Sequence, residues 1–293
     1  MGINLGSTAI SDMKIGTTQV DRAYLGSTLL WGTAPTPTVI KALKFTSSSA
    51  QTLGVDTTKL GTISPSFQYS TDNGVTWTTW DVVNDTLSFG SGTDLYVRGS
   101  NTFLAKAGDN YIKFVFSTNS PVNCSGNIMH LFDYTQDLTA FPDDANNSSR
   151  GTKRLFEGCT ALTAAPALPA TTLAGSCYYD MFSGCASLVT APALPATTLA
   201  DHCYHNMFNA CTSLSTLPLL PATTLANECY YGMFEGCTQI KISDTYSETG
   251  YPYVYTFGAI PGLDGERMFI YTGGTFTSRP TQQTYYTSNT IIS

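Results

Sequence analysis

Short alternating runs of apolar and polar residues occupy the chain from about residue 39 to 125. These runs are rich in aromatic and β-branched side chains and are bounded by turn residues, a pattern that predicts strands. Asp72-Asn73-Gly74 predicts a hairpin between two of them, because Asn-Gly supplies the positive φ angles that a type I′ turn needs. A small β-sandwich is the expected closure for such strands.

Two tryptophans in this region, Trp77 and Trp80, are three residues apart. On a regular strand they face opposite sides, so we expect one of them in the core. The other is a candidate platform on which a sugar could stack.

The segment from about residue 155 to 240 follows a different pattern, an internal repeat. One phrase recurs in three full copies and the start of a fourth, and its phenylalanines are 26 residues apart, at Phe156, Phe182, Phe208 and Phe234. A fixed period of this length is typical of a solenoid, in which each repeat buries its apolar face against its neighbours. We therefore predict a short solenoid with degenerate repeats as caps at its two ends.

Each copy is predicted to contain a helix. Leu199, Cys203 and Met207 recur every four residues after a pair of threonines, which is an amphipathic helical spacing with a hydroxyl N-cap. Gly184 follows the expected helix end, where a left-handed residue is common. The third copy departs from this pattern, because Ala210 stands at the equivalent position.

A shorter repeat of ten residues lies at the N-terminus. Its units, of the type LGST, predict short strands joined by tight turns. So small a segment buries little surface by itself, and we expect it to associate with another chain, as copies of itself or with a docking partner. The candidate attachment residues are the apolar residues of the units and the tryptophan that follows them: Leu5, Ile15, Leu25 and Trp31.

Together these patterns predict a multi-domain α+β chain. The expected domains are a β-rich anchoring segment over 1–33, a Pro/Thr linker over 34–38, the β-sandwich over 39–125, and the solenoid with its two caps over 126–293. The two prolines of the linker favour an extended, semi-rigid spacer.

Composition narrows the functional classes. The net charge is −7 and only 12% of the residues are charged, against ~25% in ordinary soluble domains. A nucleic-acid surface needs a basic stripe, and the sequence has none. The chain as given also has neither a signal-peptide pattern nor an apolar stretch of membrane-spanning length, so we expect no insertion into a membrane.

Seven of the eight cysteines follow the 26-residue period and form two ladders. Helical geometry would hold the two ladders, and equivalent cysteines in neighbouring copies, beyond disulfide reach. We interpret the thiols as small buried apolar groups, in preference to disulfides or metal ligands. The ladders are Cys159, Cys185, Cys211 and Cys237, and Cys177, Cys203 and Cys229.

Positions at which the copies differ are the candidates for function, because identical positions are explained by the shared core. On the expected helix these candidates are Tyr179, His205 and Tyr231, with His202 close to them in sequence. Their rings could anchor a glycan or a protein at the surface of the repeat.

His202 and His205 also have the HxxH spacing of a zinc site, with Cys203 between them. A zinc site usually needs a third and a fourth ligand. The matching positions in neighbouring copies are Ser176, Tyr179, Glu228 and Tyr231. Exposed helix residues are the preferred interpretation of both histidines, and we expect no metal or cofactor. Because the chain also lacks the glycine-framed serine, phosphate-loop and dinucleotide motifs, we expect no enzymatic activity.

Two stretches resemble known protein families. The MFxGCxxL and PALPA phrases resemble the leucine-rich repeats of the BspA-like kind, found in surface proteins and phage proteins of Bacteroides-type bacteria. The tandem LGST units that end in Leu29-Leu30-Trp31-Gly32 resemble the N-terminal region of virion proteins from bacteriophages of gut bacteria.

These resemblances imply a non-enzymatic phage virion surface protein, such as a fibre, tail or head decoration protein, assembled into the virion in the host cytoplasm. Its N-terminus would bind other virion proteins, its solenoid would bind a host-surface glycan or protein, and the chain would form a homo-oligomer. The alternative is a secreted adhesin of the BspA-like type at the bacterial cell surface.

Overall fold

The computed structural model describes residues 14–15, 18–19, 23–25, 28–31, 39–106, 109–142, 151–222, 224–240 and 268. The chain divides into two compact units, Met1–Ile40 and Lys41–Ser293. Within the described residues, no helix combines the length and the apolar character needed to cross a membrane.

The described residues of the first compact unit form two small antiparallel hairpins. One pairs β1 (Lys14–Ile15) with β2 (Thr18–Gln19), and the other pairs β3 (Ala23–Leu25) with β4 (Thr28–Trp31). In each hairpin two residues separate the last paired positions, Gly-Thr in one and Gly-Ser in the other. These are the short strands that the second and third LGST-type repeats predicted. The first LGST-type repeat lies outside the described residues.

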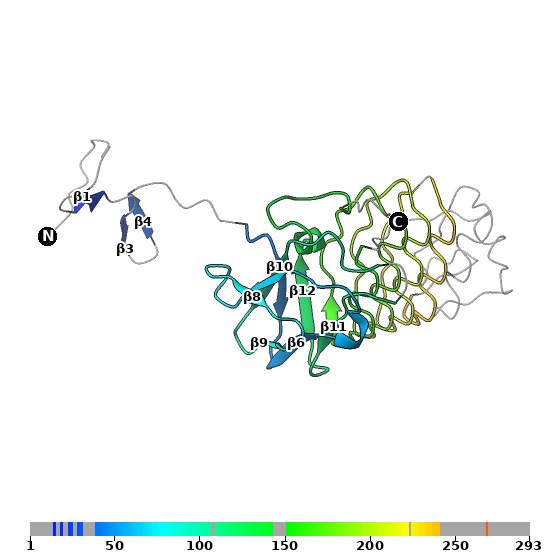
Figure 1. The fold of residues 1–293 in the computed structure, drawn as a ribbon, viewed down its shortest axis with the longest axis horizontal. Coiled ribbons are helices and arrows are strands. Elements are labelled where there is room, and N and C mark those ends of the chain that lie inside the picture. The colour runs from blue at the N-terminus through cyan, green and yellow to red at the C-terminus, as the bar shows by residue number, and fades with distance from the viewer. Residues whose placement is uncertain are drawn as a thin grey trace, which may run out of the picture. The chain divides into compact units, whose positions relative to one another are not determined.

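The second unit begins with two sheets, which Figure 1 shows beside the repeat region. A six-stranded sheet has the order β13-β12-β5-β10-β7-β8, and a three-stranded sheet has the order β11-β6-β9. All pairings are antiparallel except that of β12 with β13, which is parallel. The strands are β5 (Leu43–Thr46), β6 (Gln51–Val55), β7 (Phe67–Ser70), β8 (Thr78–Trp80), β9 (Leu87–Phe89), β10 (Leu95–Gly99), β11 (Phe114–Phe116), β12 (Val122–Gly126) and β13 (Leu162–Ala164).

The two sheets pack face to face around aromatic side chains. Phe45 on β5 lies 6.3 Å from Phe89 on β9 and 6.1 Å from Phe116 on β11, measured between ring centroids. The inward positions of β5, Leu43 and Phe45, are fully buried, because alternate side chains of a strand point to one face. The alternation read from the sequence therefore corresponds to a real core face.

The Asn-Gly hairpin is confirmed between β7 and β8. Asn73 and Gly74 have φ angles of 58° and 76°, as a turn of this sequence requires. Asp72 accepts hydrogen bonds from the backbone N–H and the hydroxyl of Thr76, and its oxygen also accepts one from the Ser70 hydroxyl. These hydrogen bonds to the charged form lower the pKa of Asp72 to about 2.

The predicted fold class, α+β with a solenoid of helix-containing leucine-rich repeats, is wrong. Apart from two short 3-10 helices, η1 (Thr57–Lys59) and η2 (Ile128–Leu131), the regular elements of the described residues are strands. The stretches predicted to be helical consist of hydrogen-bonded turns. We call them turn runs: the first spans residues 151–161, the second 174–188, the third 200–214 and the fourth 226–240.

Backbone hydrogen bonds in the turn runs alternate between two directions. In the second run Cys177 and Met181 donate to the carbonyls three residues back, Ala174 and Tyr178. Tyr178 and Asp180 donate to the next run instead, to the carbonyls of Cys203 and His205, each 25 residues on. About half of the amides in these runs therefore close local turns, and the other half join neighbouring runs. Figure 1 shows the runs as successive loops coloured green to yellow.

A left-handed residue at every fourth position prevents these turns from becoming a helix. The third run has His202, Asn206 and Ala210 at φ angles of 55°, 51° and 56°. Each is the third residue of a hydrogen-bonded turn, where a positive φ is required and Gly or Asn is favoured. An α-helix needs negative φ throughout, so the four-residue apolar period here reflects successive turns.

Aromatic side chains of the same type stack from run to run in the core. Phe156, Phe182, Phe208 and Phe234 form one stack with centroid distances of 5.5, 5.6 and 5.6 Å. Phe114 on β11 closes its first end with an edge-on contact at 5.5 Å. The sheets and the turn runs therefore share one continuous core, in which all five of these rings are fully buried.

The left-handed positions yield a pair of opposite predictions. We expect Ala210→Gly to stabilise the protein by about 0.5–1 kcal/mol, because an L-residue is strained at positive φ and glycine is not. Gly184→Ala should destabilise it by about 1 kcal/mol; the added Cβ would meet Gly158 at ordinary contact distances of 3.5 and 3.6 Å, so only the backbone strain is tested.

Urea unfolding of both variants measures these changes. Where φ is negative, glycine costs about 0.5–1 kcal/mol relative to alanine, so a destabilised Ala210→Gly variant would contradict the left-handed conformation at this position.

Candidate functional site

Three of the predicted site residues form a row of stacked rings. His205 lies between Tyr179 and Tyr231, with centroid distances of 4.5 and 4.6 Å and interplanar angles of 10° and 12°. The residues occupy equivalent positions in the second, third and fourth runs, and the backbone bond from Asp180 N to His205 O, 2.9 Å long, helps hold two of these runs together. We call these three side chains the ring row.

Exposure differs along the ring row. Tyr179 and Tyr231 are partly exposed, whereas His205 is only 8% exposed. The expectation that all variable positions lie on the surface is therefore wrong for His205. Its two faces are covered by the neighbouring tyrosines, which a comparison of the copies within the sequence could not show.

His202 and Glu228 lie next to the ring row. His202 Nε2 and His205 Nδ1 are each 3.4 Å from Glu228 Oε2. His205 Nδ1 is buried and makes no hydrogen bond within the described residues, despite this short separation. Burial, and to a smaller extent the charge of His202, lowers the pKa of His205 to about 4, so its imidazole is neutral at pH 7.

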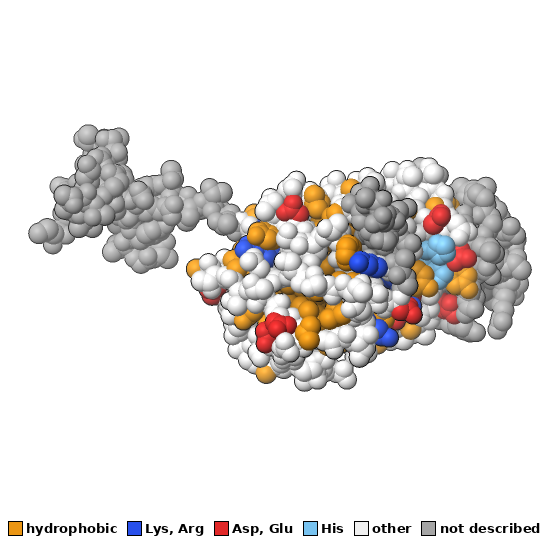
Figure 2. Space-filling model, viewed as in Figure 1, with side chains coloured by type: hydrophobic (Ala, Val, Ile, Leu, Met, Phe, Trp, Pro, Cys, Tyr) orange, Lys and Arg blue, Asp and Glu red, His pale blue; other side chains and the backbone are white. Residues whose placement is uncertain are grey.

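Figure 2 shows the pale blue histidine side chains at the surface of the repeat region, beside acidic side chains. The three potential ligand atoms, two imidazole nitrogens and one carboxylate oxygen, all lie within 4.8 Å of one another. The sequence offered both histidines and Glu228, but it placed them on helices. The left-handed turns at His202 and Glu228, with φ angles of 55° and 48°, produce this cluster instead.

Cationic side chains lie at the other end of the ring row. Lys153 Nζ is 5.2 Å and the Arg154 guanidinium carbon 5.7 Å from the centroid of Tyr179. Arg154 Nε also donates to Asp180 over 2.9 Å. Arg154 also lies within 4.0 Å of the carboxylates of Asp109 and Glu157, so its charge is largely balanced. The tyrosine edges can form hydrogen bonds and apolar contacts.

The cysteines are buried and free of disulfides, as the ladder pattern predicted. One ladder has a role that the sequence did not indicate: each of its thiols donates to a phenylalanine carbonyl. Cys185 donates to Phe156 over 3.0 Å and Cys211 to Phe182 over 3.1 Å, in both cases 29 residues earlier, and Cys159 donates to Phe114 on β11. Burial raises the pKa of Cys159 and Cys237 to about 12. These thiols are structural donors, and none is poised as a nucleophile.

The tryptophan pair also divides as predicted. Trp80 is in the core at 2% exposure. Trp77 is partly exposed, but the Arg98 guanidinium carbon lies 3.7 Å from its ring centroid and 4.0 Å from that of Tyr134. Since Arg98 occupies one face of Trp77, that face is closed to a sugar.

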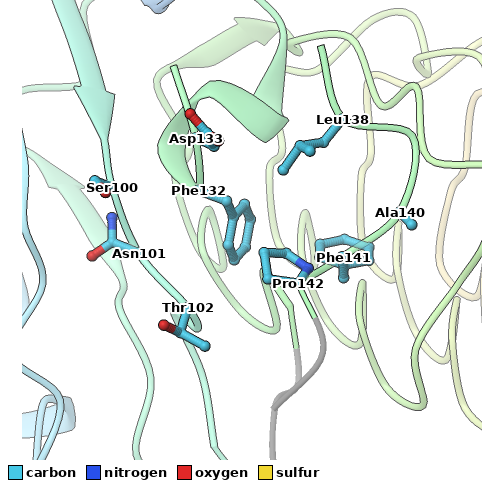
Figure 3. Close-up of a pocket in the computed structure, with 9 residues that line it drawn as sticks. All are labelled: Ser100, Asn101, Thr102, Phe132, Asp133, Leu138, Ala140, Phe141 and Pro142. Carbon is cyan, nitrogen blue, oxygen red and sulfur yellow. The ribbon is translucent and has the colours of Figure 1, made fainter. Parts of the chain in front are cut away.

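A hollow of about 560 Å³ lies between the loop after β10 and the segment that follows η2 (Figure 3). Phe132, Phe141 and Pro142 form its apolar wall, and Ser100, Asn101 and Asp133 supply polar groups. The side-chain N–H groups of Asn101 donate to the carbonyls of Ser66 and Leu131. Part of the polar lining of the hollow is therefore already hydrogen-bonded within the protein.

The structure describes the backbone of three of the four predicted attachment residues. Ile15 ends β1, Leu25 ends β3 and Trp31 ends β4. Leu5 lies outside the described residues, as does the expected C-terminal cap beyond residue 240 except for Met268. Comparison of the chain with protein families, curated proteins and solved structures finds no match.

The thiol environment predicts a specific reactivity. At pH 8 we expect the native protein to leave all eight cysteines unmodified by Ellman's reagent and to expose all of them in denaturant, because burial keeps the thiols protonated. A Val83→Cys variant, with its new thiol at a 61% exposed position, serves as the reactive control. Rapid modification of the native parent protein would contradict the buried assignment.

The same raised pKa values set the direction of a pH effect. The folded protein holds the thiol protons more tightly than the unfolded chain does. The resulting contribution to the free energy of unfolding is complete below the unfolded pKa of about 8.5. It is lost as pH rises toward 12. The free energy of unfolding, measured in urea between pH 8 and 11, should fall accordingly.

Proposed function

We propose that this protein is a non-enzymatic surface component of a bacteriophage virion, a fibre, tail or head decoration protein. Residues 1–33 attach it to other virion proteins, and the repeat region presents the ring row to a glycan or protein on the host surface. The resemblance of the LGST units to phage virion proteins and the low charge content support this assignment.

The ring row is the observation that carries the binding role. Its three rings are stacked at 4.5 and 4.6 Å and belong to runs joined by backbone hydrogen bonds. Such a row loses little conformational freedom when a ligand binds, which favours affinity. Tyrosine edges combine apolar contact with hydrogen bonding, and the side chains of Lys153 and Arg154 lie against the ring of Tyr179 at the end of the row.

The N-terminal segment supports the attachment role through its small size. The strands that the structure describes in it are two to four residues long, and their described pairings lie within hairpins. Isolated two-stranded hairpins are marginally stable in water. A second chain, either another copy of this protein or a virion partner, would supply the missing buried surface, and a homo-oligomer follows if the partner is another copy.

Location distinguishes this proposal from its alternative. Antibodies raised against the full chain should label purified phage particles in immunogold electron microscopy. Label confined to bacterial envelopes would instead support the cell-surface adhesin.

Ring-row variants test host binding. We expect Tyr179→Ala combined with Tyr231→Ala to weaken binding of the fluorescent full chain to cells of the phage's host by roughly 10-fold or more, because removing an interfacial anchor costs about 1–2 kcal/mol or more. Leu219→Ala, at a 74% exposed position in the same region, is the matched control. Flow cytometry measures both; equal binding of the double variant and the control would contradict a role for the ring row.

A further inference from the structure

His202, His205 and Glu228 form a cluster of donor atoms, of which only the His205 side chain also belongs to the ring row. We propose that these three side chains bind one divalent transition-metal ion, with zinc as the preferred ion. The donors are His202 Nε2, His205 Nδ1 and Glu228 Oε2, and all three lie within 4.8 Å of one another. The site depends on these side chains alone, whether or not the ring row contacts a host ligand.

The separations match a tetrahedral site. Zinc binds imidazole nitrogen and carboxylate oxygen at about 2.0–2.2 Å, which places neighbouring tetrahedral ligand atoms about 3.3–3.5 Å apart. The two nitrogen-to-oxygen separations in the cluster are both 3.4 Å. The His202 side chain is 35% exposed, so it has room to close the remaining nitrogen-to-nitrogen separation.

His205 supplies an independent indication of a ligand. Its side chain is nine-tenths buried, and its Nδ1 lies beside the other two donors without a hydrogen bond in the described residues. A buried nitrogen without a partner is costly, and a metal ion at this point would satisfy it. The tyrosines on both faces of the ring fix its plane, so this ligand is already oriented.

The donor set selects the class of ion. Two imidazoles and one carboxylate suit zinc and its late first-row neighbours better than magnesium or calcium, which prefer oxygen ligands. Three protein ligands leave a fourth tetrahedral position for water. Glu228 and His202 are partly exposed, at 28% and 35%, which gives the ion a path from solvent.

The bound ion would join two neighbouring turn runs. His202 and His205 belong to the third run, and Glu228 belongs to the fourth. The second run has Ser176 and Tyr179 at the positions of His202 and His205, so the cluster is specific to one pair of runs. An ion that binds only the folded chain raises its stability by mass action.

Variants can be taken from the repeat itself. His202→Ser and His205→Tyr introduce the residues that the preceding run carries, and Glu228→Ser copies Ser176, which also has a positive φ of 57°. The backbone of each position therefore accepts the new residue. Asp201→Asn is the matched control, because Asp201 is an exposed carboxylate next to the site and its Oδ1 accepts a hydrogen bond from Asn227 N.

Isothermal titration of the metal-free full chain with zinc chloride tests the site. We expect one zinc ion per chain, a rise of several degrees in the thermal midpoint with zinc, and at least 10-fold weaker binding in each single variant. Asp201→Asn should bind as the parent does. Circular dichroism checks that each variant is folded. If a variant does not fold, Glu228→Gln, which keeps the side-chain shape, takes its place.

Cobalt(II) identifies the donor atoms directly. Binding at this cluster should give d–d absorption without the intense near-ultraviolet band of thiolate ligation, since the eight cysteines are buried. Absence of stoichiometric binding, a thiolate band, or unchanged affinity in the folded variants would each overturn the proposal.

Discussion

The alternation of backbone hydrogen bonds in the turn runs is the constraint on which the rest of the repeat region depends. An amide that closes a local turn is followed by one that bonds to the next run, as Cys177 and Tyr178 illustrate. Buried backbone groups must be paired, and this arrangement pairs them without a helix and without a regular strand. It works only because every fourth residue is left-handed, and glycine, asparagine, aspartate and histidine, which adopt that conformation more readily than most residues, hold many of those positions.

Equivalent side chains stack in rows because neighbouring runs are joined at a fixed offset of 25 residues between donor and acceptor. Inside, this spacing produces the stack of phenylalanines and the thiol hydrogen bonds to their carbonyls. Outside, it produces the ring row and brings Glu228 to the two histidines. The core and the candidate site are therefore two faces of one backbone arrangement, and a change in the turns would alter both.

Some of this could be predicted from the residues. The hairpin at Asn73-Gly74, the burial of Trp80 and the burial of the cysteines all follow from local rules about turns, alternation and thiol chemistry. The helix could not be excluded, because an apolar residue at every fourth position fits both a helix and a series of four-residue turns. A usable signal was present: Asp180, Asn206 and Gly232 recur at one position, and these residue types tolerate positive φ. The phage and host-binding assignments remain proposals.

The sequence by itself determined the 26-residue period, the membership of each side-chain row and the strands of the N-terminal and central segments, because these depend on spacing and local propensity. Only the tertiary structure decided that the repeats are turns, that His205 is enclosed by two tyrosines, and that a carboxylate from the next run lies 3.4 Å from both histidines. The physical reason is that these features arise from hydrogen bonds between runs, which join residues 25 positions apart.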